Sequence, residues 1–409
     1  MKEFFKVTEL ARVLENVSVF PTVDVEDIPL VEAAGRILAG NVVADSNLPE
    51  FPRSTMDGYA VRASSTFGAT EGNPAYLTVK GAVAMGQSPK FAIGPGEACR
   101  MPTGGELPKG ADSVVMIEHI EALDDTTIEI YRSVAPGQHV LEVGEDFQQR
   151  ETILSGGQKL RPQETGLLAA FGRETVRVYK LPVIGIISTG DEVVSIDATP
   201  TPGQIRDINT YTLSGQVLMA GGIPVSYGIV RDDYAALSEK CRQALDCSDM
   251  VLLSGGSSVG TRDFTIEVIS DLPDSSILVH GISISPGKPT ILARTQNKAV
   301  WGLPGHVVSA MVVFKMVVQP FIERIAGITA GSPQLSQVSA RLNRNVSSAQ
   351  GRTDFVRVRL ITKNGELRAD PVLGKSGLIN TMVKADGLIE IDINTEGLEE
   401  GSIVNVIPL

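Results

Sequence analysis

The feature that most constrains the fold is an alternation of two hydrophobic patterns between residues 181 and 325. Short apolar runs such as PVIGIIS, IPVSYGIV and DMVLLSGG are separated by stretches with helical spacing such as YAALSEKCRQAL. Strands of a parallel sheet are buried on both faces and form apolar runs, and the helices between them cover the sheet. The pattern therefore predicts an α/β domain with a parallel sheet over residues 179–328.

Three other segments complete a multidomain α/β plus β fold. Residues 1–44 and 147–178 have a mostly helical pattern, which predicts one helical linker domain. Residues 45–146 contain short β-type runs separated by glycine and proline, which predicts an inserted β subdomain. Residues 329–409 alternate apolar and polar side chains without helical signal, which predicts a small β barrel or sandwich. A chain of 409 residues is long enough for several such cores.

Charge and cysteine content exclude several functions. The formal net charge of −12 opposes attraction to phosphate backbones and anionic bilayers. The three cysteines lack the spacing of a metal site or a disulfide framework, which favours a reducing compartment. The N-terminus does not resemble a signal peptide, and the apolar region around residues 307–322 falls short of the ~20 residues that span a bilayer. We expect a cytoplasmic protein without a nucleic-acid or membrane partner.

Five loops that follow the apolar runs carry the candidate chemistry, since ligands of open α/β sheets bind beyond the carboxyl ends of the strands. Carboxylates at 188–192 and 231–233 suit a hard cation such as Mg²⁺. The glycine-serine loop at 254–260 precedes a helix and suits a phosphate group. The loop at 286–289 presents one ammonium, and the loop at 302–306 precedes another helix. Together they predict a site for a phosphorylated ligand and a divalent metal.

Each of these features also has a simpler interpretation. Acidic residues after a strand are often helix caps or solvated turns, and His306 alone is typical of a structural side chain. The glycine-serine loop matches neither GxxxxGK[ST] nor GxGxxG, which argues against a P-loop NTPase and a Rossmann dehydrogenase. Asp57 and Thr103 lie in glycine-bearing polar turns of the β insertion, where residue type does not separate a site from an ordinary turn.

Eight ordered segments carry a resemblance that covers nearly the whole chain. They are STMDGYA at 54–60, MPTGGELPKGADSVVMIE at 101–118, GED at 144–146, STGDE at 188–192, IVRDD at 229–233, SGGSSVG at 254–260, PGKP at 286–289 and GLPG at 302–305. Taken together, they resemble the molybdopterin molybdenumtransferase family, the molybdenum insertases, which includes the catalytic domain of gephyrin. The order, the spacing and the alternation of domains are all similar to that family.

The resemblance implies a cytoplasmic, homodimeric enzyme of molybdenum cofactor biosynthesis. Such an enzyme takes adenylated molybdopterin and molybdate, cleaves the pyrophosphate-type link with the help of Mg²⁺, and releases AMP as molybdenum joins the dithiolene. Cleavage of that link is phosphoryl chemistry, which needs a metal held by carboxylates and donors aimed at developing negative charge. Transient contact with the adenylyltransferase that acts before it is also implied.

The resemblance further implies roles for individual residues. Glu192 and Asp232 would bind the metal, and Arg357 and Ser376 would contact molybdate, because arginine and hydroxyl donors suit an oxyanion. The β insertion of one subunit is expected to cover the α/β domain of the other. The residues with implied catalytic roles are Asp57, Thr103, Asp146, Glu192 and Asp232. Those with implied substrate-binding roles are Ser254, Gly255, Gly256, Ser257, Ser258, Gly260, Asp263, Lys288, Pro304 and Ser309.

Three departures from the family pattern remove basic or amide side chains. Residues 140–143 hold no arginine, Gly281 and Ser285 stand where lysines are common, and His306 with Val307 replaces an Asn-Pro pair. A charged hydrogen bond contributes about 1.5–3 kcal/mol, so these losses bear on ligand binding. They leave three alternatives open. These are a tungstate-preferring paralogue, an enzyme like the adenylyltransferase, whose single domain resembles residues 181–325, and a non-catalytic scaffold that binds molybdopterin.

Overall fold

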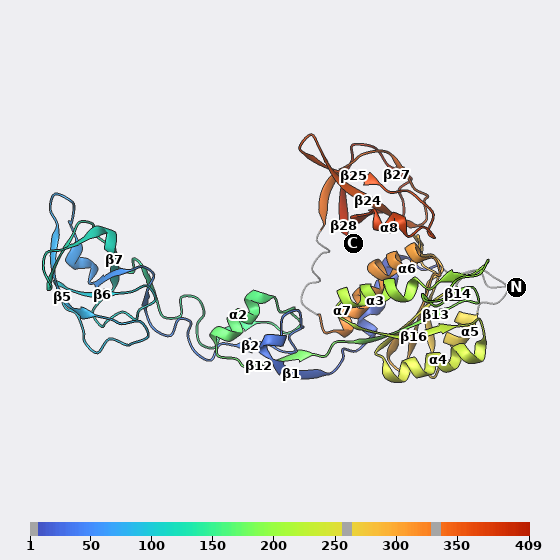
Figure 1. Ribbon diagram of the computed structural model, residues 1–409, viewed down its shortest axis with the longest axis horizontal. Helices are drawn as coiled ribbons and strands as arrows, with labels where there is room; N and C mark the ends of the chain where they lie inside the picture. Colours follow the sequence, from blue (N-terminus) through green and yellow to red (C-terminus); the bar gives the residue numbers. More distant parts are fainter. Residues whose placement is uncertain (1–6, 256–263, 329–336) are drawn as a thin grey trace. The chain divides into compact units, whose positions relative to one another are not determined.

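The computed structural model describes residues 7–255, 264–328 and 337–409, which form two compact units. The first unit comprises the described residues up to Gly40, Gly156–Thr165 and those from Glu174 onward. The second comprises Asn41–Ser155 and Gly166–Arg173. Figure 1 shows an α/β sheet and a C-terminal barrel in the first unit and a β subdomain in the second.

A six-stranded sheet forms the centre of the first unit. Its strands are β13 (Val183–Thr189), β16 (Ile223–Val230), β17 (Met250–Ser254), β18 (Ser276–His280), β20 (Ile291–Thr295) and β21 (Lys298–Leu303), in the order β16-β13-β17-β21-β20-β18. The four neighbours β16, β13, β17 and β21 are parallel, as their apolar runs predict. β20 and β18 extend the sheet in antiparallel fashion.

The prediction of a parallel sheet is therefore wrong for β18 and β20. A two-residue turn joins β20 to β21, and its residues Gln296 and Asn297 have left-handed backbones with φ of 50° and 65°. Such turns match the twist of antiparallel strands, whereas a parallel connection needs a longer crossover. The apolar pattern alone does not distinguish these two connections.

Helices cover both faces of this sheet, as the helical stretches predict. Alternate residues of β17 face opposite ways, so that Met250 and Leu252 join one apolar core while Val251 and Leu253 join another. The helices are α3 (Asn209–Met219), α4 (Tyr234–Cys247), α5 (Phe264–Ser270), α6 (Val307–Val313) and α7 (Gln319–Ile325), with a π-helical turn at Phe314–Val318. No helix among the described residues has both the length and the apolar character to cross a bilayer.

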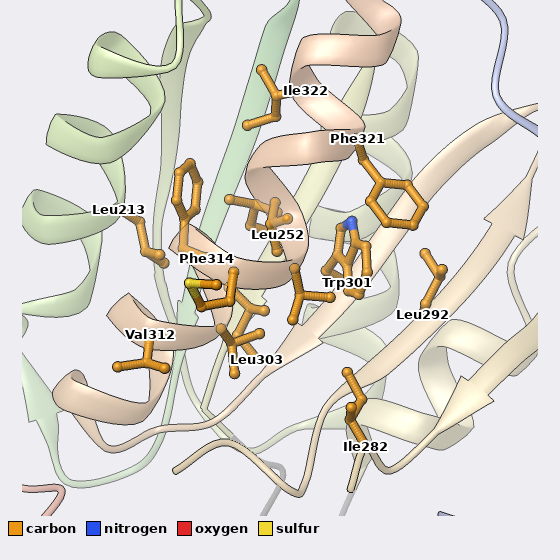
Figure 2. Packing of buried hydrophobic residues seen from close by; sticks show 14 of the residues in the cluster. Leu213, Leu252, Ile282, Leu292, Trp301, Leu303, Val312, Phe314, Phe321 and Ile322 are labelled. Carbon is orange, nitrogen blue, oxygen red and sulfur yellow. The ribbon is translucent and has the colours of Figure 1, made fainter. Parts of the chain in front are cut away.

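The larger core lies where α6, α7 and β21 meet (Figure 2). Trp301 packs edge to face on Phe321, with ring centroids 5.0 Å apart, and Phe321 packs in the same manner on Phe20 at 5.7 Å. Phe355 and Met382 of the C-terminal segment belong to the same core. The α/β sheet, the N-terminal residues and the barrel therefore share one apolar interior.

The C-terminal segment folds into the predicted β barrel. Its strands are β22 (Val338–Leu342), β24 (Thr353–Lys363), β25 (Glu366–Pro371), β26 (Gly387–Ile391) and β28 (Ile403–Pro408). The barrel closes because β24 pairs with both β25 and β26. A short helix, α8 (Asn380–Val383), interrupts the strands, and β19 (Ile284–Ser285) of the α/β segment adds to the edge of β24.

The second unit contains the predicted β insertion. Six strands form one sheet, in the order β7-β4-β6-β5-β9-β8, and it is buried on both faces by alternating side chains such as Ala60 and Val61. The strands are β4 (Gly58–Val61), β5 (Ala75–Ala82), β6 (Glu97–Met101), β7 (Ser113–Met116), β8 (Ile120–Ala122) and β9 (Thr127–Ile130).

The helical pattern expected for residues 1–44 and 147–178 is not confirmed. Within these segments, the described residues are helical only at α1 (Leu10–Glu15), α2 (Pro162–Ala170) and short 3-10 turns. β1 (Val25–Pro29) instead pairs with β12 (Thr175–Tyr179), and β2 (Val42–Val43) pairs with β11 (Thr152–Leu154). Each pair joins segments that are distant in sequence, so a local helical pattern was overridden by long-range strand pairing.

Candidate functional site

Five loops meet at one edge of the α/β sheet. The parallel strands β13, β16, β17 and β21 all end there. Ile291 of β20 lies opposite Gly302 near the end of β21, which brings the preceding loop at 286–289 to the same edge. The common edge predicted from the apolar runs is therefore present, although two of the strands are antiparallel. Parallel strands place their following loops together in this way.

A hydrogen bond connects acidic residues from two of these loops. Thr189 Oγ1 donates to Asp232 Oδ1 at 3.0 Å, and the Asp232 backbone N–H donates to Asp191 Oδ1 at 3.2 Å. Gly190 makes the turn before them with φ of 146°, and a Cβ there would lie 2.8 Å from Glu192 Oε2. Glu192 and Asp191 are exposed and Asp232 is half-buried. The structure thus adds Asp191 to the predicted pair of Glu192 and Asp232.

Asn209, at the start of α3, joins two of the loops and is absent from the predicted site residues. Its Nδ2 donates to Ser254 Oγ at 2.6 Å and to the Gly305 carbonyl at 2.8 Å. The phosphate-type loop after β17 is thereby tied to the loop after β21. A polar residue just before the helical run TYTLSGQVLM is the signal that could have identified it.

Asp207 supports the same helix start from inside the protein. It is 7% exposed, and its Oδ1 accepts from Ser188 Oγ at 3.0 Å and from the Thr210 backbone N–H at 3.1 Å. A buried carboxylate is tolerated only where donors satisfy it. Asp207 therefore fixes the position of α3, and with it Asn209, relative to the end of β13.

The start of the glycine-serine loop packs tightly against β13. Gly255 has φ of 118°, and a Cβ there would lie 2.1 Å from the Thr189 carbonyl oxygen, so a side chain does not fit. The Gly255 backbone N–H donates to the Leu303 carbonyl at 3.4 Å. Five predicted substrate-binding residues lie outside the described residues, namely Gly256, Ser257, Ser258, Gly260 and Asp263.

The loop at 286–289 also needs its glycine. Gly287 has φ of 124°, and a Cβ there would lie 2.4 Å from Val313 Cγ2. The Lys288 side chain is exposed, while its carbonyl accepts from Ile282 and Thr290 backbone N–H groups at 2.9 Å each. The other predicted binding residues nearby, Pro304 and Ser309, are both buried.

Arg357 of β24 reaches the loop that contains Ser376. Arg357 is 9% exposed, its Nη1 donates to Thr381 Oγ1 at 3.0 Å, and its Nη2 donates to the Gly374 carbonyl at 2.9 Å. Burial lowers the pKa of this guanidinium from its ordinary value. Among the described residues neither Nη atom pairs with a carboxylate. A buried cation of this kind suits an anionic ligand.

In the second unit, Asp57 and Thr103 form a hydrogen-bonded pair. They lie at adjacent ends of β4 and β6, where Gly58 is opposite Met101. Asp57 Oδ1 accepts from the Thr103 backbone N–H at 2.7 Å and from Thr103 Oγ1 at 3.1 Å. These two donors lower the pKa of the Asp57 carboxyl, the backbone N–H having the larger effect. Both side chains are exposed, so the pair can meet a ligand.

Asp146 lies in a separate turn of the second unit. Its backbone N–H donates to the Leu48 carbonyl at 3.0 Å, and Gly144 before it has φ of 71°. Its carboxylate is exposed. Among the described residues it makes no hydrogen bond with Asp57 or Thr103. The structure therefore joins two of the three predicted catalytic residues of this unit.

The carboxylates near Asp232 are compatible with a magnesium ion that binds together with a phosphorylated substrate. No group of three or more histidine, cysteine or acidic side chains in the described part of the chain is placed to hold a metal alone. Mg²⁺, however, keeps several waters and usually binds through one or two carboxylates plus substrate phosphates. Asp191, Glu192 and Asp232 supply carboxylates of that kind at one edge.

Family models match three consecutive parts of the chain. Residues 6–172 match the MoeA N-terminal region (domain I and II), residues 185–324 match a model described as "Probable molybdopterin binding domain", and residues 339–409 match the MoeA C-terminal region (domain IV). These matches cover the β insertion, the α/β sheet and the barrel in the same order.

Relatives with established names match along almost the entire length. The chain is 37% identical over 392 residues to a protein of Methanocaldococcus jannaschii whose name assigns it provisionally to molybdopterin biosynthesis, covering 93% of this chain and 92% of that one. It is 31% identical to the molybdopterin molybdenumtransferase of Bacillus subtilis, covering 94% and 90%. A crystal structure of a molybdopterin biosynthesis MoeA protein from Pyrococcus horikoshii is similar with a TM-score of 0.81 and 37% identity, covering 98% and 99%.

The fold and the site thus define a multidomain protein of molybdenum cofactor biosynthesis type. The chain belongs to the MoeA family, whose curated members include enzymes named molybdopterin molybdenumtransferase.

Proposed function

We propose that this chain is a molybdopterin molybdenumtransferase that inserts molybdenum into adenylated molybdopterin and releases AMP with the help of Mg²⁺. The observation that carries this proposal is the edge of the α/β sheet, where the Asp232 backbone N–H donates to Asp191 and Asn209 joins Ser254 to Gly305. One edge thus offers both metal ligands and a phosphate loop.

Each group has a role in this proposal. Bound Mg²⁺, held by Glu192 and Asp232, would neutralise negative charge on the phosphate oxygens as the link breaks. The loop that begins at Ser254 binds the phosphate of the pterin, with Lys288 as a cation at the same edge. Arg357 and Ser376 bind the molybdate, because a buried guanidinium and a hydroxyl are suitable donors for a tetrahedral oxyanion.

The second unit supplies the remaining catalytic groups. Asp57 stays ionised because two donors of Thr103 lower its pKa, and Asp146 is the other carboxylate assigned to the reaction. The proposal includes a cytoplasmic homodimer and transient contact with the adenylyltransferase that produces the adenylated pterin.

The test is release of AMP from adenylated molybdopterin with Mg²⁺, with molybdate, tungstate or no oxyanion. We expect oxyanion-dependent release that falls about 100-fold or more in Asp57→Ala and in Asp232→Ala, since positioned acid-base and metal-binding carboxylates contribute on this scale. Asp124→Ala is the matched control, because Asp124 Oδ1 also accepts from a threonine N–H and hydroxyl, those of Thr126, at 2.7 and 2.8 Å.

The same assay separates the alternatives. Stronger release with tungstate than with molybdate identifies a tungstate enzyme, and consumption of ATP with formation of the adenylated pterin identifies an adenylyltransferase. A folded protein that binds the adenylated pterin and releases no AMP with either oxyanion is a binding scaffold, and this result contradicts the proposal.

A further inference from the structure

His306 joins the α/β sheet to residues 374–378 of the barrel, a segment named here the oxyanion loop. It is the residue before α6, and its Nδ1 lies 3.0 Å from Ser376 Oγ. Two residues later, the Val308 backbone N–H donates to the Ser376 carbonyl at 3.1 Å. The start of α6 therefore holds Ser376 through both its side chain and its backbone.

The residue before His306 is tied to the phosphate loop. The Gly305 carbonyl accepts from Asn209 Nδ2, which also donates to Ser254 Oγ. A Cβ on Gly305 would lie 3.5 Å from the Gly255 Cα, so the two loops run close together. Gly305, which is tied to the phosphate loop, is therefore directly followed by His306, which bonds the oxyanion loop.

Arg357 holds the opposite end of the oxyanion loop. Its Nη2 donates to the Gly374 carbonyl, whereas His306 is bonded at Ser376 and a Cβ on Gly377 would lie 3.9 Å from its Cδ2. Most of this loop is exposed, and Gly374, Lys375 and Gly377 offer no apolar side chain to anchor it. The loop is therefore held mainly by polar attachments: Arg357 at Gly374, and His306 with the Val308 N–H at Ser376.

We propose that His306 is a positioning residue that fixes the oxyanion loop against the pterin-binding edge and thereby sets the affinity for the tetrahedral oxyanion. The inference rests on the proposed function, in which Ser376 contacts that oxyanion. Preorganised donors bind more tightly than donors that must first be ordered. His306 is therefore expected to change the affinity for the oxyanion, and to do so through Ser376.

Two amide substitutions test the hydrogen bond, because both remove the imidazole ring and they differ in whether a polar atom remains at the place of Nδ1. His306→Asn keeps a polar atom bonded to Cγ, at the place of Nδ1, so it can still bond Ser376 Oγ. His306→Gln moves its polar atoms one bond farther out and loses that place. Asn therefore serves as the rescuing variant and Gln as the disrupting one, while His119→Gln in the second unit is the control for a substituted histidine.

The kinetic arm measures KM and kcat for molybdate in AMP release. We expect His306→Gln to raise KM about 3- to 10-fold, as for loss of one hydrogen bond, with kcat within about twofold of the unsubstituted protein. His306→Asn and His119→Gln should remain within about twofold in KM. In a Ser376→Ala background, His306→Gln should add no further increase, because the two residues act as one unit.

The structural arm needs no catalysis. Amide hydrogen exchange at Val308 and over residues 374–383 should become faster in His306→Gln and stay unchanged in His306→Asn. A protein that releases no AMP with any oxyanion overturns the proposed function, while the exchange arm still tests the attachment. Exchange and KM that do not differ between the Gln and Asn variants overturn this inference. If the Gln variant does not fold, Ser376→Ala removes the same bond from the other side, and amide exchange at Val308 is then the deciding readout, because Ser376 itself contacts the oxyanion; unchanged exchange in Ser376→Ala overturns the inference.

Discussion

In each of the two units, candidate site residues are held mainly by hydrogen bonds to neighbouring residues. Asp57 is bonded to Thr103, Asp207 to Ser188 and Thr210, and Asn209 to two loops at once. Such bonds fix the direction of each side chain before a ligand arrives, which lowers the entropy cost of binding. The consequence is that conservative substitutions at supporting residues should have measurable effects.

Thr103→Val tests the electrostatic part of this arrangement. It removes the hydroxyl donor and keeps the backbone N–H, so the pKa of Asp57 should rise toward its ordinary value and remain below it. A carboxyl with a depressed folded-state pKa stabilises the protein above its unfolded pKa, near 4, and loses this contribution as the pH falls through the folded value. Carbon-detected NMR titration of Asp57 measures the shift. Thr103→Ser should leave the pKa low, and an equal rise in Ser and Val would contradict the assignment.

Asp207→Ala tests the buried support of α3. It leaves the Thr210 N–H without its acceptor and removes one of two partners of Ser188 Oγ, whose other partner is Thr210 Oγ1 at 2.9 Å; an unsatisfied buried donor costs about 1–3 kcal/mol. Urea denaturation should show a lower free energy of unfolding by about that amount. Asp207→Asn retains an oxygen acceptor and should lose less, so equal losses in both variants would show that the hydrogen bonds are not the cause.

Among the site residues, the sequence predicts the position of a loop most directly where an acidic or glycine-rich segment follows an apolar run. Carboxylates directly after β13 and β16, and the glycine-serine loop after β17, indicated the edge by themselves. Family resemblance assigned roles to Asp57 and Thr103 separately, and only the structure shows that they form a hydrogen-bonded pair, since two exposed turns give no local sign that they meet. Asp207 and Asn209 were missed because polar residues at a helix start have an ordinary capping role, and only the structure reveals which loops they bond.

At the scale of elements, the strands buried on both faces were predictable and the ones paired at long range were not. β13 and β17 are continuous apolar runs, and such runs indicate a covered sheet whatever surrounds them. β1 has the sequence VEDIP with one buried residue, Ile28. Its partner β12 lies far along the chain. Local periodicity therefore carried no information about this pair.

Gly287→Ala tests an element connection, the loop that places Lys288. A Cβ there would meet Val313 of α6 at 2.4 Å in a backbone conformation that favours glycine. Overpacking and backbone strain each cost about 1–3 kcal/mol, so the free energy of unfolding should fall by at least that amount. Gly351→Ala shares the positive φ, 86°, but meets no atom within 4 Å, and it should cost less. Chemical denaturation of both variants measures the difference, and equal losses would show that contact with α6 is unimportant.

At the scale of the whole molecule, the candidate residues are divided between two compact units. Asp57, Thr103 and Asp146 lie in the second unit, and the sheet edge and the barrel lie in the first. In the proposed homodimer, residues of both chains complete each site. This arrangement makes a prediction that no single-chain site would make.

Mixing Asp57→Ala with Asp232→Ala chains tests the shared site. Random exchange between two inactive dimers yields heterodimers in which one of the two sites has both carboxylates, so about one quarter of the native activity should return. The assay is AMP release after unfolding and refolding the mixture. Each variant refolded alone is the control, and no recovery in a mixture with proven heterodimers would place all these groups in one chain.

The packing of Phe20 on Phe321 has a consequence for synthesis on the ribosome. Domains usually fold as units while the chain emerges, yet Val13 and Phe20 leave the ribosome long before α7, against which they are buried. The entire β insertion and the whole α/β sheet are translated in the interval. The nascent chain must therefore carry these apolar side chains without their final partners. Chains released before residue 321 should depend most strongly on holding chaperones.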